Sequence, residues 1–77
     1  MIHELKTEKK YYDRVVTGEK KFELRKNDRD FQVGDEIILI EMVEDGTLAI
    51  DGIRLAIKYI LHGPLFGLEA GYCILNW

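Results

Sequence analysis

Three charged side chains follow a glycine at a spacing that suits ligand binding. Gly18 is followed by Lys20, Glu23 and Arg25 within eight positions. Lysine and arginine hold phosphate groups and base edges through charge-assisted hydrogen bonds, and a carboxylate between them can orient both cations. The segment is therefore a candidate site for a phosphate or a nucleobase edge. The alternative is an ordinary ion pair between Glu23 and Arg25 on the surface of a strand.

Neighbouring polar residues could extend this candidate site. Lys21 and Lys26 flank it, and a polar loop follows directly. Loop side chains can form hydrogen bonds with a ligand, but the same residue types also cap tight turns, and both interpretations remain open. The complete candidate ligand-binding set is Lys20, Lys21, Glu23, Arg25, Lys26, Asn27, Asp28 and Arg29.

Other reactive side chains form weaker patterns. His3 and His62 would form a metal or proton-transfer pair only if their strands were neighbours, and we expect two unrelated histidines. The single Cys73 excludes an internal disulfide and a cysteine-based zinc cluster, and we expect it in the core. We therefore predict no metal ion and no cofactor. Phe66, in a glycine-spaced loop, is the aromatic residue that we most expect to be exposed.

Composition and charge limit the classes of function. The 77 residues are 47% hydrophobic and 32% charged, which is typical of one globular domain covering residues 1–77. Residues 1–30 hold nine Lys/Arg and seven Asp/Glu, a balance of +2, whereas residues 31–77 hold two and seven, a balance of −5. A protein that binds nucleic acid without sequence preference over a large surface should be basic throughout, because phosphate contacts dominate its affinity. Any such binding should be confined to a local patch in the first third of the chain.

The setting of the protein is inferred from what the sequence lacks. No apolar run is long enough to span a bilayer, and the charged beginning of the chain lacks the apolar core of a signal peptide. With a single cysteine, a reducing, cytoplasmic location is the simplest expectation. A domain this small is expected to be a monomer, or to dimerise weakly through an uncovered strand edge.

The elements that position the candidate site begin with a strand over Ile2 to Leu5. A helix is predicted from Glu8 to Thr17, with Thr7 as its N-cap and Gly18 as its C-terminal stop. Its apolar face should consist of two pairs spaced four residues apart, namely Tyr11, Tyr12, Val15 and Val16.

A second strand is predicted over Lys21 to Lys26, with Phe22 and Leu24 facing the interior. A strand over Glu36 to Val43 is apolar on both faces, so we expect the helix to cover its outer face. Strict alternation places Lys20 on the inward face, and Glu23 and Arg25 on the opposite face. Either a bulge realigns these residues or they have separate roles.

The second half of the chain is predicted to be all β. Asp45-Gly46 and Asp51-Gly52 are tight-turn signals, with a short uncertain segment between them. Strands follow over Arg54 to Leu61 and over Tyr72 to Trp77. The fold is thus mostly β with one main helix (α+β), in the order β-α-β-β-(β)-β-β. Five or six short strands favour a small, closed or nearly closed barrel, since closure removes exposed edges.

A family resemblance is carried by the segment Gly18-x-Lys20-x-x-Glu23-x-Arg25. It resembles the G-x-K-x-x-E-x-R signature of ASCH domains, which are PUA-like barrels. The opening His3 to Lys6 and the run Phe22 to Phe31 are similar to short, uncharacterised bacterial and phage-type PUA-like proteins of the DUF3850 type. Further similar segments are Val33-Gly34-Asp35, Tyr59-Ile60-Leu61 and Gly71-Tyr72.

The resemblance implies an RNA- or nucleotide-binding module, with the ligand between helix and barrel and no catalysis. The alternative is a small amidohydrolase that removes an acyl group from a nucleoside such as acetylated cytidine. Lys20, Glu23 and Glu69 would then be catalytic, but Glu23 stands where that pattern has a threonine. A third possibility is an accessory module that binds another protein through Leu65 and Phe66.

Overall fold

The fold is mostly β with one short helix, as the sequence predicts. The computed structural model describes residues 1–43 and 48–77, so the predicted Asp45-Gly46 turn lies outside the described residues. No helix in the described ranges is long and apolar enough to cross a membrane. The elements are β1 (Ile2–Glu8), α1 (Lys9–Val16), β2 (Phe22–Lys26), β3 (Glu36–Met42), β4 (Leu48–Ala56), β5 (Tyr59–His62) and β6 (Tyr72–Asn76).

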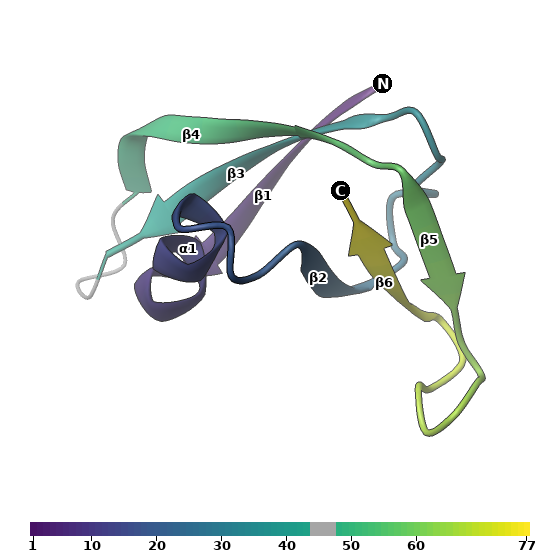
Figure 1. Ribbon diagram of the computed structural model, residues 1–77. Helices are drawn as coiled ribbons and strands as arrows, with labels where there is room; N and C mark the ends of the chain where they lie inside the picture. Colours follow the sequence, from purple (N-terminus) through teal and green to yellow (C-terminus); the bar gives the residue numbers. More distant parts are fainter. Residues whose placement is uncertain (44–47) are drawn as a thin grey trace.

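The strands form two three-stranded sheets, with the order β1-β3-β4 in the first and β2-β6-β5 in the second (Figure 1). Strand β1 runs parallel to β3, and the remaining pairs are antiparallel. Parallel neighbours need a crossover connection, which α1 and β2 supply here. The pairings in the described part of the chain do not close the two sheets into a barrel.

The core lies between the two sheets and under the helix. Every second residue of β1, from His3 to Thr7, is buried, and the same alternation places Ile37 and Leu39 of β3 inside. The buried apolar cluster draws on both sheets, the helix and the connecting segments: Leu5, Val15, Phe31, Ile37, Leu39, Ile57, Ile60, Cys73 and Leu75. The sheets therefore share one core, although in residues 1–43 and 48–77 no strand of one sheet pairs with a strand of the other.

The helix begins and ends within one residue of its predicted bounds, but two details of the prediction were wrong. Thr7 does not cap the helix, because β1 continues to Glu8 and buries the Thr7 side chain. Glu8 occupies the N-cap position without a side-chain cap. Only Tyr12 and Val15 pack against the core, whereas Tyr11 and Val16 are exposed.

The helix also does not cover the outer face of β3. Val15 of α1 belongs to the same cluster as Leu39, so the helix packs on the inner face of the first sheet. The side chains on the opposite face of β3 are half-buried and lie outside this cluster; they are Ile38 and Ile40. An apolar strand can thus be half-covered on its second face by its own neighbours rather than by a separate layer.

Asp51-Gly52 is not a turn, contrary to the prediction, because β4 runs through it. Gly52 pairs with Ile40, next to a shift in register between Ile40 and Met42. A Cβ at Gly52 would lie 2.8 Å from Ile38 Cγ2 and 3.0 Å from the Leu39 carbonyl oxygen. This glycine therefore permits close approach of two strands at an irregular point, which is another known use of glycine in a sheet.

The predicted strand from Arg54 to Leu61 is divided in two. Strand β4 ends at Ala56, and the chain then changes sheets. The Ile57 amide donates to the Asp35 carbonyl at 2.9 Å, and the Lys58 amide donates to the Asn76 carbonyl at 2.8 Å. The corner reverses the alternation, so Ile60 rather than Tyr59 is buried.

Candidate functional site

The turn after α1 places Lys20 beneath the end of the helix. Gly18 has a φ of +82°, which favours glycine, and its amide donates to the Val15 carbonyl at 3.1 Å. The Lys20 amide then donates to the Arg14 carbonyl at 3.0 Å, so the backbone of Lys20 is tied to the last helical turn. Nearby, Arg14 and Thr17 hold the Glu19 carboxylate and lower its pKa.

Glu23 is the centre of the predicted site. Its side chain is 6% exposed, and each carboxylate oxygen accepts a hydrogen bond from a different cation. Lys20 Nζ donates to one oxygen, and Arg25 Nη2 donates to the other at 2.9 Å. Lys20 Nζ also donates to the Phe22 carbonyl at 2.7 Å. One buried carboxylate therefore fixes a lysine and an arginine side by side, an arrangement with one excess positive charge that can attract an anion.

The predicted orientation of β2 was wrong, and the correction explains how the three residues meet. Glu23 faces the interior, whereas Phe22 and Leu24 face solvent and are 49% and 56% exposed. Arg25 has the same parity as Glu23. Lys20 precedes the strand, so strict alternation does not apply to it. No bulge is needed to bring the three side chains together.

An open hollow of about 320 Å³ lies beside the three residues. Its lining consists of Tyr11, Lys20, Phe22, Glu23 and Leu24. The Lys20 ammonium lies 5.1 Å from the centre of the Phe22 ring and 5.7 Å from that of Tyr11. The role of both rings was missed in the sequence, because each was assigned to the core. A planar group in this hollow would meet aromatic surface and a cation together.

Two arginines from the second half of the predicted site tie the sheets together. Arg25 Nη2 donates to the Lys6 carbonyl, and Arg29 Nη1 donates to the Glu4 carbonyl at 2.6 Å. Both carbonyls belong to β1, which is an edge strand of the first sheet. Guanidinium groups thus take the place of a neighbouring strand there. The contact of Arg29 with β1 is structural, whereas the Arg25 guanidinium donates both to β1 and to Glu23.

The loop residues after β2 mainly organise the loop itself. Asn27 Oδ1 accepts the Phe31 amide at 3.1 Å, and the Asn27 amide donates to the Gly71 carbonyl at 2.8 Å. The Asp28 amide donates to the Lys26 carbonyl at 2.9 Å. Of the predicted set, the structure therefore brings together Lys20, Glu23 and Arg25. Lys21 and Lys26 are exposed and do not line the hollow beside Lys20.

Glu69, the third residue of the hydrolase alternative, lies elsewhere. It is exposed in the loop before β6 and lines a separate hollow of about 270 Å³ with Leu24, Gly67, Leu68 and Tyr72. Only Leu24 is shared between this hollow and the one beside Lys20. The three proposed catalytic residues therefore do not meet in a single hollow.

A second buried carboxylate was not identified in the sequence. Asp35 accepts hydrogen bonds from His3 Nε2 at 2.8 Å, from the Gln32 amide at 3.1 Å and from the Met1 nitrogen at 3.2 Å. The hydrogen bond from His3 is the main cause that lowers the pKa of Asp35 to about 2. The His3 ring is buried edge-on against Phe31, with centroids 4.7 Å apart.

The remaining reactive residues do not form a site. His3 and His62 belong to different sheets, and His62 is exposed. Cys73 is buried as predicted; burial, followed by the nearby Asp28 charge, raises the pKa of its thiol. Within residues 1–43 and 48–77, no group of histidine, cysteine and carboxylate side chains is arranged to hold a metal ion.

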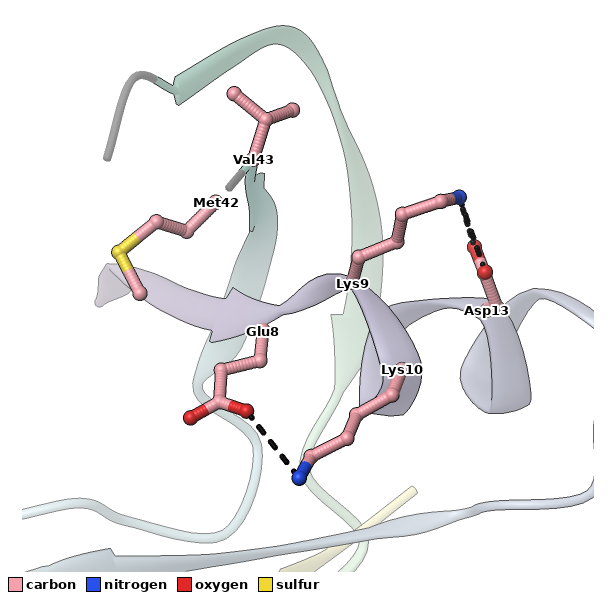
Figure 2. Close-up of a pocket in the computed structure, with 6 residues that line it drawn as sticks. All are labelled: Glu8, Lys9, Lys10, Asp13, Met42 and Val43. Carbon is pink, nitrogen blue, oxygen red and sulfur yellow. Dashed lines mark hydrogen bonds and ion pairs between the residues drawn. The ribbon is translucent and has the colours of Figure 1, made fainter. Parts of the chain in front are cut away.

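A hollow of about 600 Å³ at the beginning of α1 is lined by Glu8, Lys9, Lys10, Asp13, Met42 and Val43. Figure 2 shows these six side chains. Their charges are largely paired with each other. Lys9 lies 3.0 Å from Asp13, and Lys10 lies 3.6 Å from Glu8. None of the predicted site residues is in the lining of this hollow, so the cluster around Glu23 remains the candidate site.

Comparison with known proteins agrees with the phage-type resemblance. The sequence from residue 2 to residue 77 matches a family described as a domain of unknown function, DUF3850. An uncharacterised 12.9 kDa protein in the GpA 3′ region of Escherichia phage P2 is 49% identical over 43 residues. This stretch covers 56% of the present chain and 39% of the phage protein. The chain thus aligns with well under half of that relative.

Proposed function

The chain belongs to the DUF3850 family, and on that premise we propose that it is an RNA- or nucleotide-binding module that holds its ligand at Lys20 and Arg25. The observation that carries the proposal is the pairing of both cations with one buried carboxylate, Glu23, beside an open aromatic hollow. We further propose that the two sheets are a variant of the PUA-like barrel of ASCH domains. The G-x-K-x-x-E-x-R signature and the shared core support this relationship.

The charges of the cluster favour an anionic ligand. Two cations surround one carboxylate, so the cluster has a net positive charge. An ammonium and a guanidinium have more N–H donors than their contacts with Glu23, Phe22 and Lys6 use. The remaining donors can bind a phosphate oxygen or the carbonyl edge of a base. Glu23 would orient both cations before the ligand arrives, which reduces the entropic cost of binding.

The aromatic rings favour a nucleotide over a simple anion. The Tyr11 and Phe22 rings both lie close to the Lys20 ammonium, and a base placed there would contact a ring as well as a cation. Base stacking on aromatic side chains contributes about 1–3 kcal/mol per base. The acidic second part of the chain limits the footprint, so we expect binding to depend only weakly on salt.

Isothermal titration calorimetry with ribonucleoside 5′-monophosphates and inorganic phosphate would test this proposal. The wild-type protein should bind a nucleotide more tightly than phosphate, and Lys20→Ala should weaken binding about tenfold or more. Lys9→Ala is the matched control, because Lys9 is an exposed helical lysine that lies outside the hollow. Equal nucleotide affinity in Lys20→Ala and the wild type would contradict the proposal.

The hydrolase alternative keeps one supporting observation, namely the direct contact of Lys20 with Glu23 in a hollow. Against it, Glu69 lines a different hollow, and both oxygens of Glu23 already accept hydrogen bonds from cations. Incubation of concentrated protein with acetylated cytidine, followed by chromatography, separates the two functions. Release of cytidine that is abolished by Lys20→Ala would favour the hydrolase.

The proposed binding of another protein depends on the loop before β6. Phe66 is 98% exposed, as predicted, and Leu65 is partly exposed. If this loop carries the function, Phe66→Ala should abolish it while Lys20→Ala leaves it intact.

A further inference from the structure

The outer face of the second sheet is apolar, aromatic and exposed. The registers of β2, β6 and β5 place one set of side chains on this face: Phe22, Leu24, Lys26, Tyr59, Leu61, Tyr72, Ile74 and Asn76. Phe22, Leu24, Tyr59 and Tyr72 are 49%, 56%, 60% and 38% exposed. A contiguous exposed apolar face of this kind is unusual on a monomer and indicates a binding surface.

The positions of the rings on this face are set by the strand register. Phe22 and Tyr59 both pair with Asn76, one from each side of β6, so they flank the same point of the central strand. Tyr72 lies at the other end of β6 and pairs with Lys26. Because neighbouring strands are about 4.8 Å apart, the rings are spread over the face rather than stacked on one another. Each ring therefore offers its own surface to a planar group.

The charges around this face distinguish among possible occupants. Lys21 and Lys58 directly precede Phe22 and Tyr59, and Lys26 belongs to the face itself. Within the described ranges none of these lysines forms an ion pair, and none of the eight residues of the face is acidic. The outer face of the first sheet differs, because its three glutamates, Glu4, Glu8 and Glu36, outnumber its cations, Lys6 and Arg54. A polyanion that also presents planar rings fits the second sheet and not the first.

The face is continuous with the candidate site around Glu23. Phe22 and Leu24 line the hollow beside Lys20, and Leu24 and Tyr72 line the hollow next to the loop before β6. A ligand long enough to pass from the first hollow to the second would follow β2 along its length. The two hollows share Leu24 in their lining, so a single strand of linked nucleotides can contact both at once.

We propose that the outer face of the second sheet binds single-stranded nucleic acid, whose bases stack on Phe22, Tyr59 and Tyr72 while Lys21, Lys26 and Lys58 contact its phosphates. The inference deepens the proposed function, on which it rests for the class of ligand, and it assigns a surface beyond Lys20 and Arg25. A duplex is excluded from this mode of binding, because its bases are already stacked on each other. A second copy of the chain fits poorly, since face-to-face pairing would bring the same lysines together.

The test measures fluorescence anisotropy of labelled oligouridylate and oligothymidylate of about eight nucleotides, a length within the site sizes of single-strand-binding folds. The wild type should bind these oligomers about tenfold or more tightly than uridine monophosphate, because more bases stack. Tyr59→Ala should weaken oligomer binding about tenfold and leave monophosphate binding unchanged, since Tyr59 lines none of the hollow beside Lys20. Tyr59→Phe should restore oligomer binding.

Matched controls are available for the ring and for the charge. Phe66→Ala removes an exposed ring outside the face and should leave the affinity unchanged. Lys58→Ala should reduce the slope of log affinity against log salt by about 0.7, whereas Lys6→Ala, on the outer face of the first sheet, should not. Circular dichroism of each variant checks that it is folded.

The outcomes separate this inference from the proposed function. Monophosphate binding that is lost in Lys20→Ala, together with oligomer binding unaffected by Tyr59→Ala, would overturn the stacking face and keep the site at Lys20. Oligomer binding that depends on Tyr59, without any monophosphate binding, would support the stacking face on the second sheet. It would contradict the proposed site at Lys20. Sedimentation of the wild type as a dimer that Tyr59→Ala dissociates would assign the face to a second copy and overturn the inference.

Discussion

Two carboxylates, Asp35 and Glu23, are both nearly buried in this small domain, and their surroundings differ in one respect. The main partner of Asp35 is the His3 ring, which is itself buried, and a second partner is the backbone amide of Gln32. The partners of Glu23 are the ends of two long side chains, Lys20 and Arg25, which remain 15% and 26% exposed. One carboxylate is thus enclosed by the fold, and the other holds two cations at an open hollow.

The difference shows how the same chemical group can stabilise a fold or prepare a binding site. The buried His3 ring and the Gln32 amide have no further donors directed at a ligand, and the exposed Met1 nitrogen is a third partner, so Asp35 is expected to act mainly on stability. Flexible cationic partners keep donors for a ligand while the buried carboxylate orients them. The comparison therefore predicts that removal of Asp35 mainly lowers stability, whereas removal of Glu23 mainly lowers binding.

The largest effect on stability is expected for Asp35→Ala. The substitution leaves the buried His3 ring and the Gln32 amide without their acceptor, and unsatisfied buried donors are strongly destabilising. Urea unfolding should show a greater loss of stability than any substitution at Glu23. Nucleotide affinity, measured under conditions where the variant is folded, should be unchanged. If Asp35→Ala were as stable as the wild type, the proposed distinction between the two carboxylates would be contradicted.

Acid should reproduce part of this loss. The folded-state pKa of Asp35, about 2, is below its ordinary value of 3.8. Its contribution to stability is therefore fully present above its ordinary pKa and is lost as the pH falls from about 4 towards 2. Stability measured against pH should fall less steeply in this window for Asp35→Asn than for the wild type. Glu19 and Glu36 also have lowered pKa values but are present in both proteins. Parallel curves for the two proteins would contradict the assignment.

Glu23→Gln should have a smaller effect on stability and a larger effect on binding. Loss of one partner of a buried ion pair costs about 3–5 kcal/mol, but Lys20 and Arg25 can rehydrate, so we expect about 2 kcal/mol. Nucleotide affinity should fall, because the two cations are no longer held in place. If the gain in positive charge raised the affinity instead, Glu23 would not be the orienting group. Calorimetry and urea unfolding of one preparation measure both quantities.

The smallest effect is expected for Arg29→Ala. Arg29 donates to the Glu4 carbonyl on the edge of β1, and an exposed hydrogen bond of this kind contributes about 1 kcal/mol or less. Thermal unfolding should show a slight decrease in Tm, and nucleotide affinity should not change. A substantial loss of affinity would extend the site to the loop after β2, as the sequence also allowed.

The sequence predicted the elements better than it predicted which face of each strand is buried. The approximate bounds of the helix, the stop at Gly18 and the apolar strand β3 were confirmed, whereas the predicted cap at Thr7 was wrong. The alternation of side chains in β2 defines two faces of the strand but does not determine which face is buried. Hydrophobicity favoured Phe22 and Leu24, whereas the structure buries Glu23, because Lys20 and Arg25 satisfy it. The change of sheet at Ile57 depends on contacts distant in sequence, and no local signal marks it.

The sequence predicted the three central residues of the candidate site but not the residues that surround them. Lys20, Glu23 and Arg25 are close in sequence, so their meeting needs only the turn at Gly18. The neighbouring ring of Tyr11 comes from the helix, and its place depends on how the helix packs. The buried position of Asp35 was not predicted, because its main partner, His3, lies far away in the sequence.

The most direct test of the central claim is an NMR titration of the isotope-labelled protein with a ribonucleoside 5′-monophosphate. We predict amide shift changes that cluster between residues 18 and 25, that include Tyr11 and spare Asp35, and that disappear in Lys20→Ala. Shift changes centred on Asp35, or unchanged by Lys20→Ala, would contradict the claim that the open carboxylate cluster, rather than the enclosed one, is the binding site.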